Sequence, residues 1–150
     1  MIETIVGIIT AVIIILLSQV LSKYFTTKLF AATILVAIAF IYVGFSLKGN
    51  STNLVILEVG VALVFYFMAI IGYTKNTLLI ACGILLHGIW DILHHKGLPV
   101  QTEIPGYYPT FCFTVDIIDG LFFLFLFKAT KKRNPVPFKS FAIRRLKNSI

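Results

Sequence analysis

The feature that most constrains this chain is a series of long apolar runs that leaves little room for a water-facing surface. Hydrophobic residues make up 59% of the 150 residues and charged residues only 13%, whereas about a quarter of the residues in a soluble domain are charged. A globule of this size has too little interior to bury so many apolar segments. Lipid must cover them, so the chain is predicted to be an integral membrane protein.

Five segments reach or approach the ~20 apolar residues that a helix needs to cross about 30 Å of hydrocarbon. The first follows Met1-Ile2-Glu3 without a basic stretch, which indicates a membrane helix and not a cleavable signal peptide. The sequence therefore predicts an all-α, polytopic bundle over residues 1–128, with transmembrane helices at about 3–22, 29–47, 52–73, 76–95 and 108–128. Short connections predict that consecutive helices are antiparallel neighbours, and only residues 96–107 form a longer loop.

Lys and Arg are distributed unevenly between the two ends of this bundle. With a cytoplasmic C-terminus, eleven of them lie inside and only Lys48 and Lys96 lie outside, as the positive-inside rule requires. Five crossings then place the N-terminus outside. The expected location is the cell membrane, in bacteria the inner membrane.

The basic excess lies at the C-terminal end, and residues 129–150 are expected to form a basic cytoplasmic tail. Its attraction to anionic lipid headgroups explains this charge, so the chain is expected to bind no nucleic acid although its pI is high. Phe138, Ala142, Leu146 and Ile150 recur every four residues among Lys and Arg. That spacing favours a short amphipathic helix on the membrane surface.

Apart from Glu3, which begins the first expected helix, four of the six acidic residues and all three histidines fall within the expected helices. Ionisable groups are costly there and persist mostly where they face a bundle interior, pair with one another and serve a function. A rise of 1.5 Å per residue, counted from the expected outer helix ends, puts five of them about 5–17 Å below the outer surface. These five are Glu58, His87, Asp91, Asp116 and Asp119.

Helical periodicity places the polar residues of the last two helices on one face each. His87, Asp91, His94 and His95 share a face of the fourth helix, and Cys112, Asp116 and Asp119 share a face of the fifth. Imidazole and carboxylate groups on facing helices are how bundles build metal centres, and such ligands suit zinc, iron or manganese. We therefore expect a divalent metal held by His87, Asp91, His94, His95 and Asp116, with Cys112 as a further candidate. Glu58 or Asp119 would be the catalytic base that activates water at the metal.

The same residues also have simpler interpretations. His94 and His95 suit the dipole at the C-terminal end of a helix, and His87 with Asp91 could form a buried structural pair. Glu58 could be a neutral carboxyl group that links helices by hydrogen bonds. Cys112 could be a small buried hydrophobic residue.

Two segments carry a resemblance to a known family. His-Gly-Ile-Trp-Asp-Ile-Leu-His-His (87–95) and Tyr-Pro-Thr-Phe-Cys-Phe-Thr-Val-Asp (108–116) resemble the HGxWDxxHH … YPxFCxxxD signature of small uncharacterised bacterial integral membrane proteins of unknown function. The resemblance covers roughly the last two helices and implies no reaction. Membrane desaturases need more histidines than the three present here, and ceramidase-like hydrolases have more helices.

Three functional hypotheses follow from the polar layer. The leading one is a metal-dependent membrane enzyme, hydrolase-like, that acts on a lipid or isoprenoid substrate. The second is a protein for proton relay, transport or metal handling, and the third is an accessory subunit that packs against a partner membrane protein or forms a homo-oligomer. A conduit would need polar residues in the cytoplasmic half as well, where the last two helices offer mainly Thr77, Cys82 and phenylalanines. This pattern favours a one-sided pocket.

Overall fold

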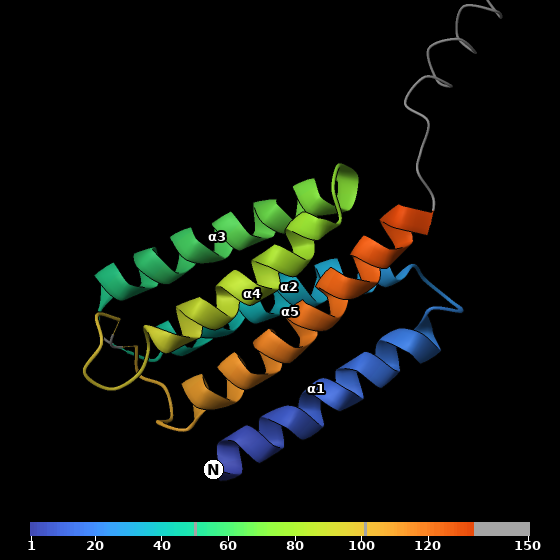
Figure 1. The fold of residues 1–150 in the computed structure, drawn as a ribbon. Helices are drawn as coiled ribbons and strands as arrows, with labels where there is room; N and C mark the ends of the chain where they lie inside the picture. The colour runs from blue at the N-terminus through green and yellow to red at the C-terminus, as the bar shows by residue number, and fades with distance from the viewer. Residues whose placement is uncertain (50, 101, 134–150) are drawn as a thin grey trace, which may run out of the picture.

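The structure is a computed structural model that describes residues 1–49, 51–100 and 102–133. In these residues the chain forms five α-helices and no strand (Figure 1), namely α1 (Ile2–Leu21), α2 (Thr27–Ser46), α3 (Thr52–Thr74), α4 (Leu78–Ile92) and α5 (Tyr108–Arg133). The predicted all-α polytopic fold is confirmed. The amphipathic helix predicted within the tail lies outside the described residues.

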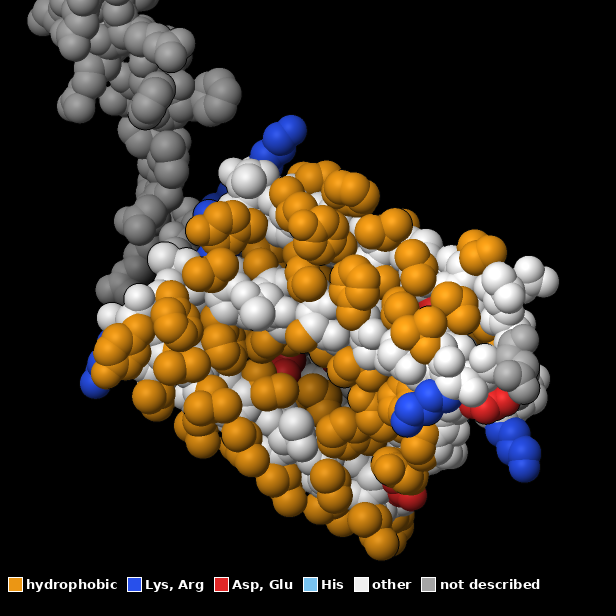
Figure 2. All heavy atoms as spheres, turned by 180° about the vertical axis from the view of Figure 1, so that it is seen from behind, with side chains coloured by type: hydrophobic (Ala, Val, Ile, Leu, Met, Phe, Trp, Pro, Cys, Tyr) orange, Lys and Arg blue, Asp and Glu red, His pale blue; other side chains and the backbone are white. Residues whose placement is uncertain are grey.

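The helix surfaces are those of a membrane protein. Four helices are long and apolar enough to cross a membrane, and only α4, with 15 residues, is shorter. Apolar side chains cover most of the face shown in Figure 2. Over the described residues, large apolar side chains stand exposed, among them Leu16 at 58%, Phe67 at 55% and Phe125 at 66%. An apolar surface of this extent requires a lipid or protein cover. The chain is a multi-pass membrane protein.

The bundle has two ends, a loop end and a tail end. The loop end carries residues 93–100 and 102–107, the N-terminus, the end of α2 and the start of α3 (Figure 1). The tail end carries the α1–α2 and α3–α4 connections and the C-terminal end of α5. α4 lies at the centre and packs against α5, α3 and α2. Alanines on the facing sides of α2 and α3, such as Ala39 and Ala62, are almost fully buried and let the two helices approach closely.

The place of α1 differs from the expected order. α1 packs mainly against α5 and only lightly against α2, although the connection from α1 to α2 is short. Its buried residues are small: Gly7, Ala11 and Ser18. A Cβ atom at Gly7 would lie 2.9 Å from Cβ of Thr114 on α5, so this stripe fits closely against α5.

α4 ends earlier than the sequence pattern indicates. The expected segment runs to His95, but the helix stops at Ile92 and residues 93–95 continue as a tighter turn. The backbone N–H groups of Leu93, His94 and His95 each bond the carbonyl three residues back, which is the 3₁₀ pattern of a helix end. Gly97 follows with a φ of 86°, a value that glycine adopts without strain. At the other end, α5 continues past the expected 128 to Arg133.

Candidate intramembrane metal site

Buried polar side chains from several helices gather in the half of the bundle nearer the loop end. Glu58, His87, Asp91, His94, Thr102, Asp116 and Asp119 are each at most 7% exposed. They form two groups of contacts and one separate carboxyl group. We call the two groups the His87 group (His87, Asp91, Asp116) and the Glu58 group (Glu58, Trp90, His94, Thr102).

The His87 group joins α4 to α5. His87 Nδ1 lies 2.7 Å from Asp116 Oδ2 and 3.7 Å from Asp91 Oδ1. One ligand atom from each of the three residues lies within 4.8 Å of the other two. The i, i+4 spacing of His87 and Asp91 puts both on the face of α4 that meets α5, so the two polar stripes do face each other.

Gly88 explains how α5 comes so close. A Cβ atom on this glycine would lie 3.3 Å from Cβ of Asp116, which is tighter than an ordinary contact. The absence of a side chain at Gly88 therefore lets the Asp116 backbone approach α4. The carboxyl group of Asp116 then reaches the imidazole of His87.

Tyr42 is a member of this network that the sequence pattern did not single out. Its hydroxyl donates a hydrogen bond of 2.8 Å to Asp91 Oδ1, and its ring stacks on His94 with centroids 3.9 Å apart and planes 13° apart. The side chain is 1% exposed. A signal was present, because a tyrosine hydroxyl inside an apolar helix needs a hydrogen-bond partner.

The Glu58 group ties α3 to the end of α4 and to the loop. Glu58 Oε1 accepts a hydrogen bond of 2.6 Å from the Thr102 hydroxyl and lies 2.7 Å from His94 Nε2. Glu58 Oε2 accepts from Trp90 Nε1 at 3.3 Å. The carboxyl group of Glu58 is thus held by three partners.

His94 belongs to this second group and is not brought into the His87 group. Its Nδ1 lies 3.0 Å from the carbonyl oxygen of Trp90, and because a carbonyl oxygen only accepts, Nδ1 carries a proton. Nε2 faces Glu58, so both ring nitrogens are engaged. His95, half-buried in the turn after α4, and Cys112, buried one helical turn before Asp116, also lie outside the three-residue metal group.

Asp119 is the least satisfied of the buried groups. The side chain is 1% exposed, and neither carboxyl oxygen has a hydrogen-bond partner among the described residues. Asp91 Oδ2 is in the same situation. A buried polar atom without a partner costs about 1–3 kcal/mol, so three such oxygens in one region point to an ion or water that satisfies them.

The dimensions of the His87 group suit a metal ion. Ligand atoms about 2.1 Å from a tetrahedral metal lie about 3.4 Å from one another. The distances of 2.7 Å and 3.7 Å from His87 Nδ1 to the two carboxyl oxygens lie on either side of this value. Small side-chain rotations would therefore equalise them around one cation.

Comparison with known proteins gives the family of the chain but no function. The sequence model of a family of unknown function, DUF6010, matches residues 2–131. Neither a curated protein nor a solved structure matches the chain. The resemblance to a family of unknown function is thus confirmed, and a functional conclusion has to come from the site.

Proposed function

As the chain belongs to DUF6010, a family of unknown function, we propose its role from the geometry: it is a membrane protein that binds one divalent metal ion through His87, Asp91 and Asp116. The single observation that carries this proposal is the packing of two carboxyl groups around one buried imidazole. Zinc, iron and manganese are the metals that this ligand set suits.

Charge balance is compatible with a bound cation. Without one, two ionised carboxylates beside one imidazolium would leave a net negative charge in a region that is at most 2% exposed, so a carboxyl group of the bare site would have to take up a proton. A divalent cation with two carboxylates and a neutral imidazole has no net charge. The hydrogen bond from Tyr42 to Asp91 would orient one ligand, as outer-shell partners do in metal sites.

The catalytic form of this proposal is a hydrolase that acts on a lipid or isoprenoid substrate. Three protein ligands leave a coordination position for water or substrate, as in catalytic zinc sites. Asp119 lies one turn further along α5 than Asp116, and its unpartnered carboxyl group suits a general base toward water. The position of the site inside the membrane domain supports this choice of substrate class.

Proton relay is the second candidate, and one observation speaks against it. Hydrogen-bond distances link His94 to Glu58 and His87 to Asp116. Between the His94–Glu58 pair and the His87–Asp116 pair, however, Tyr42 contacts His94 only by ring stacking. A stacked ring face cannot pass a proton on. A relay would need a water to bridge this step, whereas the metal proposal needs none.

Thermal unfolding in detergent tests metal binding. After a chelator has been applied and removed, Zn²⁺, Mn²⁺ or Fe²⁺ should raise the unfolding temperature of the wild type, because a ligand at 100 times its Kd stabilises the fold by about 2.7 kcal/mol. Asp116→Asn should lose this response, and Glu103→Gln, an exposed carboxylate outside the site, should keep it. No shift with any of the metals would refute the proposal.

Hydrolysis needs its own measurement. Asp119→Asn should bind metal as the wild type does but lose metal-dependent release of product from a panel of lipid esters and isoprenoid diphosphates. If Asp119→Asn abolishes metal binding as well, Asp119 is a ligand and not a base. If the wild type turns over nothing on the panel while it binds metal, the chain is a metal-handling protein.

A further inference from the structure

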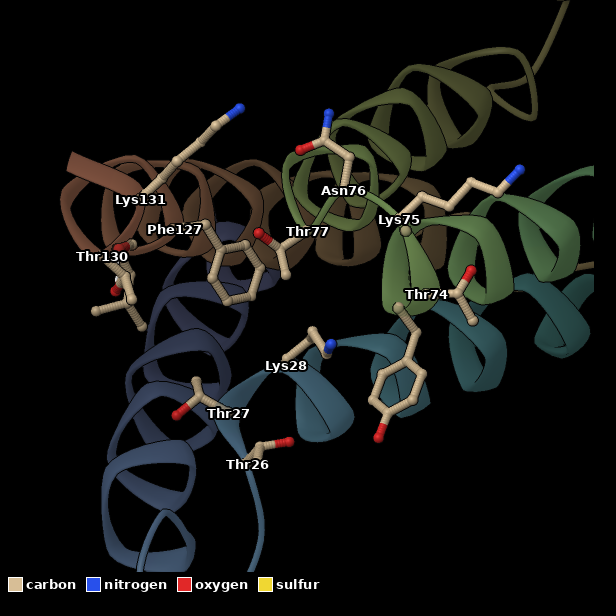
Figure 3. Close-up of a pocket in the computed structure, with 13 residues that line it drawn as sticks. Thr26, Thr27, Lys28, Thr74, Lys75, Asn76, Thr77, Phe127, Thr130 and Lys131 are labelled. Atoms are coloured by element: carbon tan, nitrogen blue, oxygen red, sulfur yellow. Dashed lines mark hydrogen bonds between the residues drawn. The ribbon is translucent and has the colours of Figure 1, made fainter. Parts of the chain in front are cut away.

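The tail end holds a cavity that has no part in the metal site. The cavity has a volume of about 820 Å³ and lies among the first residues of α2, the α3–α4 connection and the last turns of α5. Figure 3 shows Lys75 and Lys131 extending from two sides of its rim, with Thr77 and Lys28 between them. Most of the other lining residues carry hydroxyl or amide groups.

The charge of this cavity is positive and uncompensated. Among the described residues, three lysines line it and no acidic residue does. No Asp or Glu follows Asp119 in the sequence. Asp119 itself lies in the half of the bundle nearer the loop end. The helix dipoles add little, because α2 and α4 begin at the cavity while α3 and α5 end there. The lysines therefore favour an anionic ligand.

An apolar groove meets the cavity at Tyr73. This groove, of about 290 Å³, lies between α2 and α3 and is lined almost entirely by apolar side chains such as Val36 and Ile70. Tyr73 lines both spaces, and Lys28 Nζ lies 4.4 Å from the centre of its ring. A positive, hydroxyl-rich cavity thus adjoins an apolar groove on the outer surface of the bundle, with Tyr73 lining both.

We propose that this composite site binds an anionic glycerophospholipid. Its phosphate lies in the cavity among Lys28, Lys75 and Lys131, and one acyl chain follows the groove between α2 and α3. A free phosphate would use the lysines but not the groove, and a neutral lipid would use the groove but not the lysines. Charge and apolar surface together select a molecule with both parts.

Native mass spectrometry of the full chain in a non-ionic detergent tests the site with two probes, phosphatidylglycerol and phosphatidylcholine with the same acyl chains. The wild type should retain phosphatidylglycerol about tenfold more tightly than phosphatidylcholine. The triple variant Lys28→Gln/Lys75→Gln/Lys131→Gln should bind phosphatidylglycerol about 10- to 100-fold more weakly, since each lysine near an anionic headgroup contributes. Replacement of the same three lysines by Arg should restore binding and shows that the fold is intact.

A matched control separates the cavity from the general charge of the tail end. Lys23→Gln/Lys128→Gln/Lys132→Gln removes the same charge from exposed positions that do not line the cavity and should leave the affinity unchanged. An equal loss in both triple variants would overturn the proposal, because the lipid would then respond only to net charge.

The groove is tested by filling it. Thr33→Trp, in the groove, should weaken phosphatidylglycerol binding, while Ala37→Trp, exposed one turn further along α2 and outside the groove, should not. Inorganic phosphate should compete poorly. If inorganic phosphate displaces the lipid fully and Thr33→Trp has no effect, the ligand is a free phosphate and the lipid assignment is wrong.

Discussion

The ring of Tyr42 stacks on the ring of His94 with centroids 3.9 Å apart. Because the hydroxyl of the same tyrosine donates to Asp91, this single side chain joins the Glu58 group to the His87 group. The buried polar side chains near the loop end therefore form one connected core. They come from α2, α3, α4 and α5, and Thr102 adds a contact from the loop.

Tyr42→Phe keeps the stacked ring and removes only the hydroxyl. The variant removes the hydrogen bond that Tyr42 donates to Asp91, whose other carboxyl oxygen already lacks a partner among the described residues. We therefore expect the free energy of unfolding to fall by about 1–3 kcal/mol. Metal affinity should fall about tenfold or more, as for other outer-shell partners. Unfolding and metal titration of the purified protein measure both, with Tyr66→Phe on the exposed face of α3 as control.

Glu58→Gln should lower the stability of the fold without lowering the amount of metal bound. The substitution keeps the shape of the side chain but removes the charge that His94, Thr102 and Trp90 surround, so we expect a loss of about 1–3 kcal/mol in stability. Metal content per chain should stay that of the wild type, because Glu58 is outside the three-residue metal group. A variant that is stable but empty of metal would show instead that Glu58 is a ligand.

Close packing of α5 on α4 gives a prediction that is independent of any ligand. A Cβ atom at Gly120 would lie 2.7 Å from Cγ of Leu85 and 3.1 Å from its backbone nitrogen, so Gly120→Ala should destabilise the fold by about 1–3 kcal/mol. Gly60 has no such neighbour within 4 Å in the described part of the chain. Gly60→Ala should therefore be neutral or slightly stabilising in the same unfolding assay.

The orientation of the bundle follows from charge and can be measured with reporters. Lys48 and Lys96 lie at the loop end, whereas the other described lysines lie at the tail end, so the tail end should be cytoplasmic. A green fluorescent protein fused after residue 150 should fluoresce in a bacterial host, and alkaline phosphatase at the same place should be inactive. The reverse pattern would place the metal site in the cytoplasmic half.

Much of the fold could be predicted because local sequence determines it. Each helix is a run of apolar residues, and the faces of α4 and α5 follow from 3.6-residue periodicity, so the contact of His87 with Asp116 could be anticipated. The packing of α1 against α5 could not, since it depends on how small residues such as Gly7 fit a distant helix. That fit is a property of the assembled bundle.

The division of the site into two groups also could not be predicted from the sequence. Tyr42 bonds Asp91, which lies 49 positions away in the sequence, and Thr102 bonds Glu58, which lies 44 positions away. Periodicity within a single helix gives no information on such pairs. The turn after Ile92 rotates His94 out of the regular helical register, so its helical angle did not predict its contacts. His94 thereby meets Glu58 and not the metal group.

The most direct test of the central claim is the amount of metal bound per chain after purification in mild detergent without chelators. We predict one zinc, iron or manganese ion per chain in the wild type, a loss of at least about 90% in His87→Ala and Asp116→Asn, and full retention in Glu103→Gln. A wild type that carries no metal and takes up none on titration, or variants that keep it, would contradict the account.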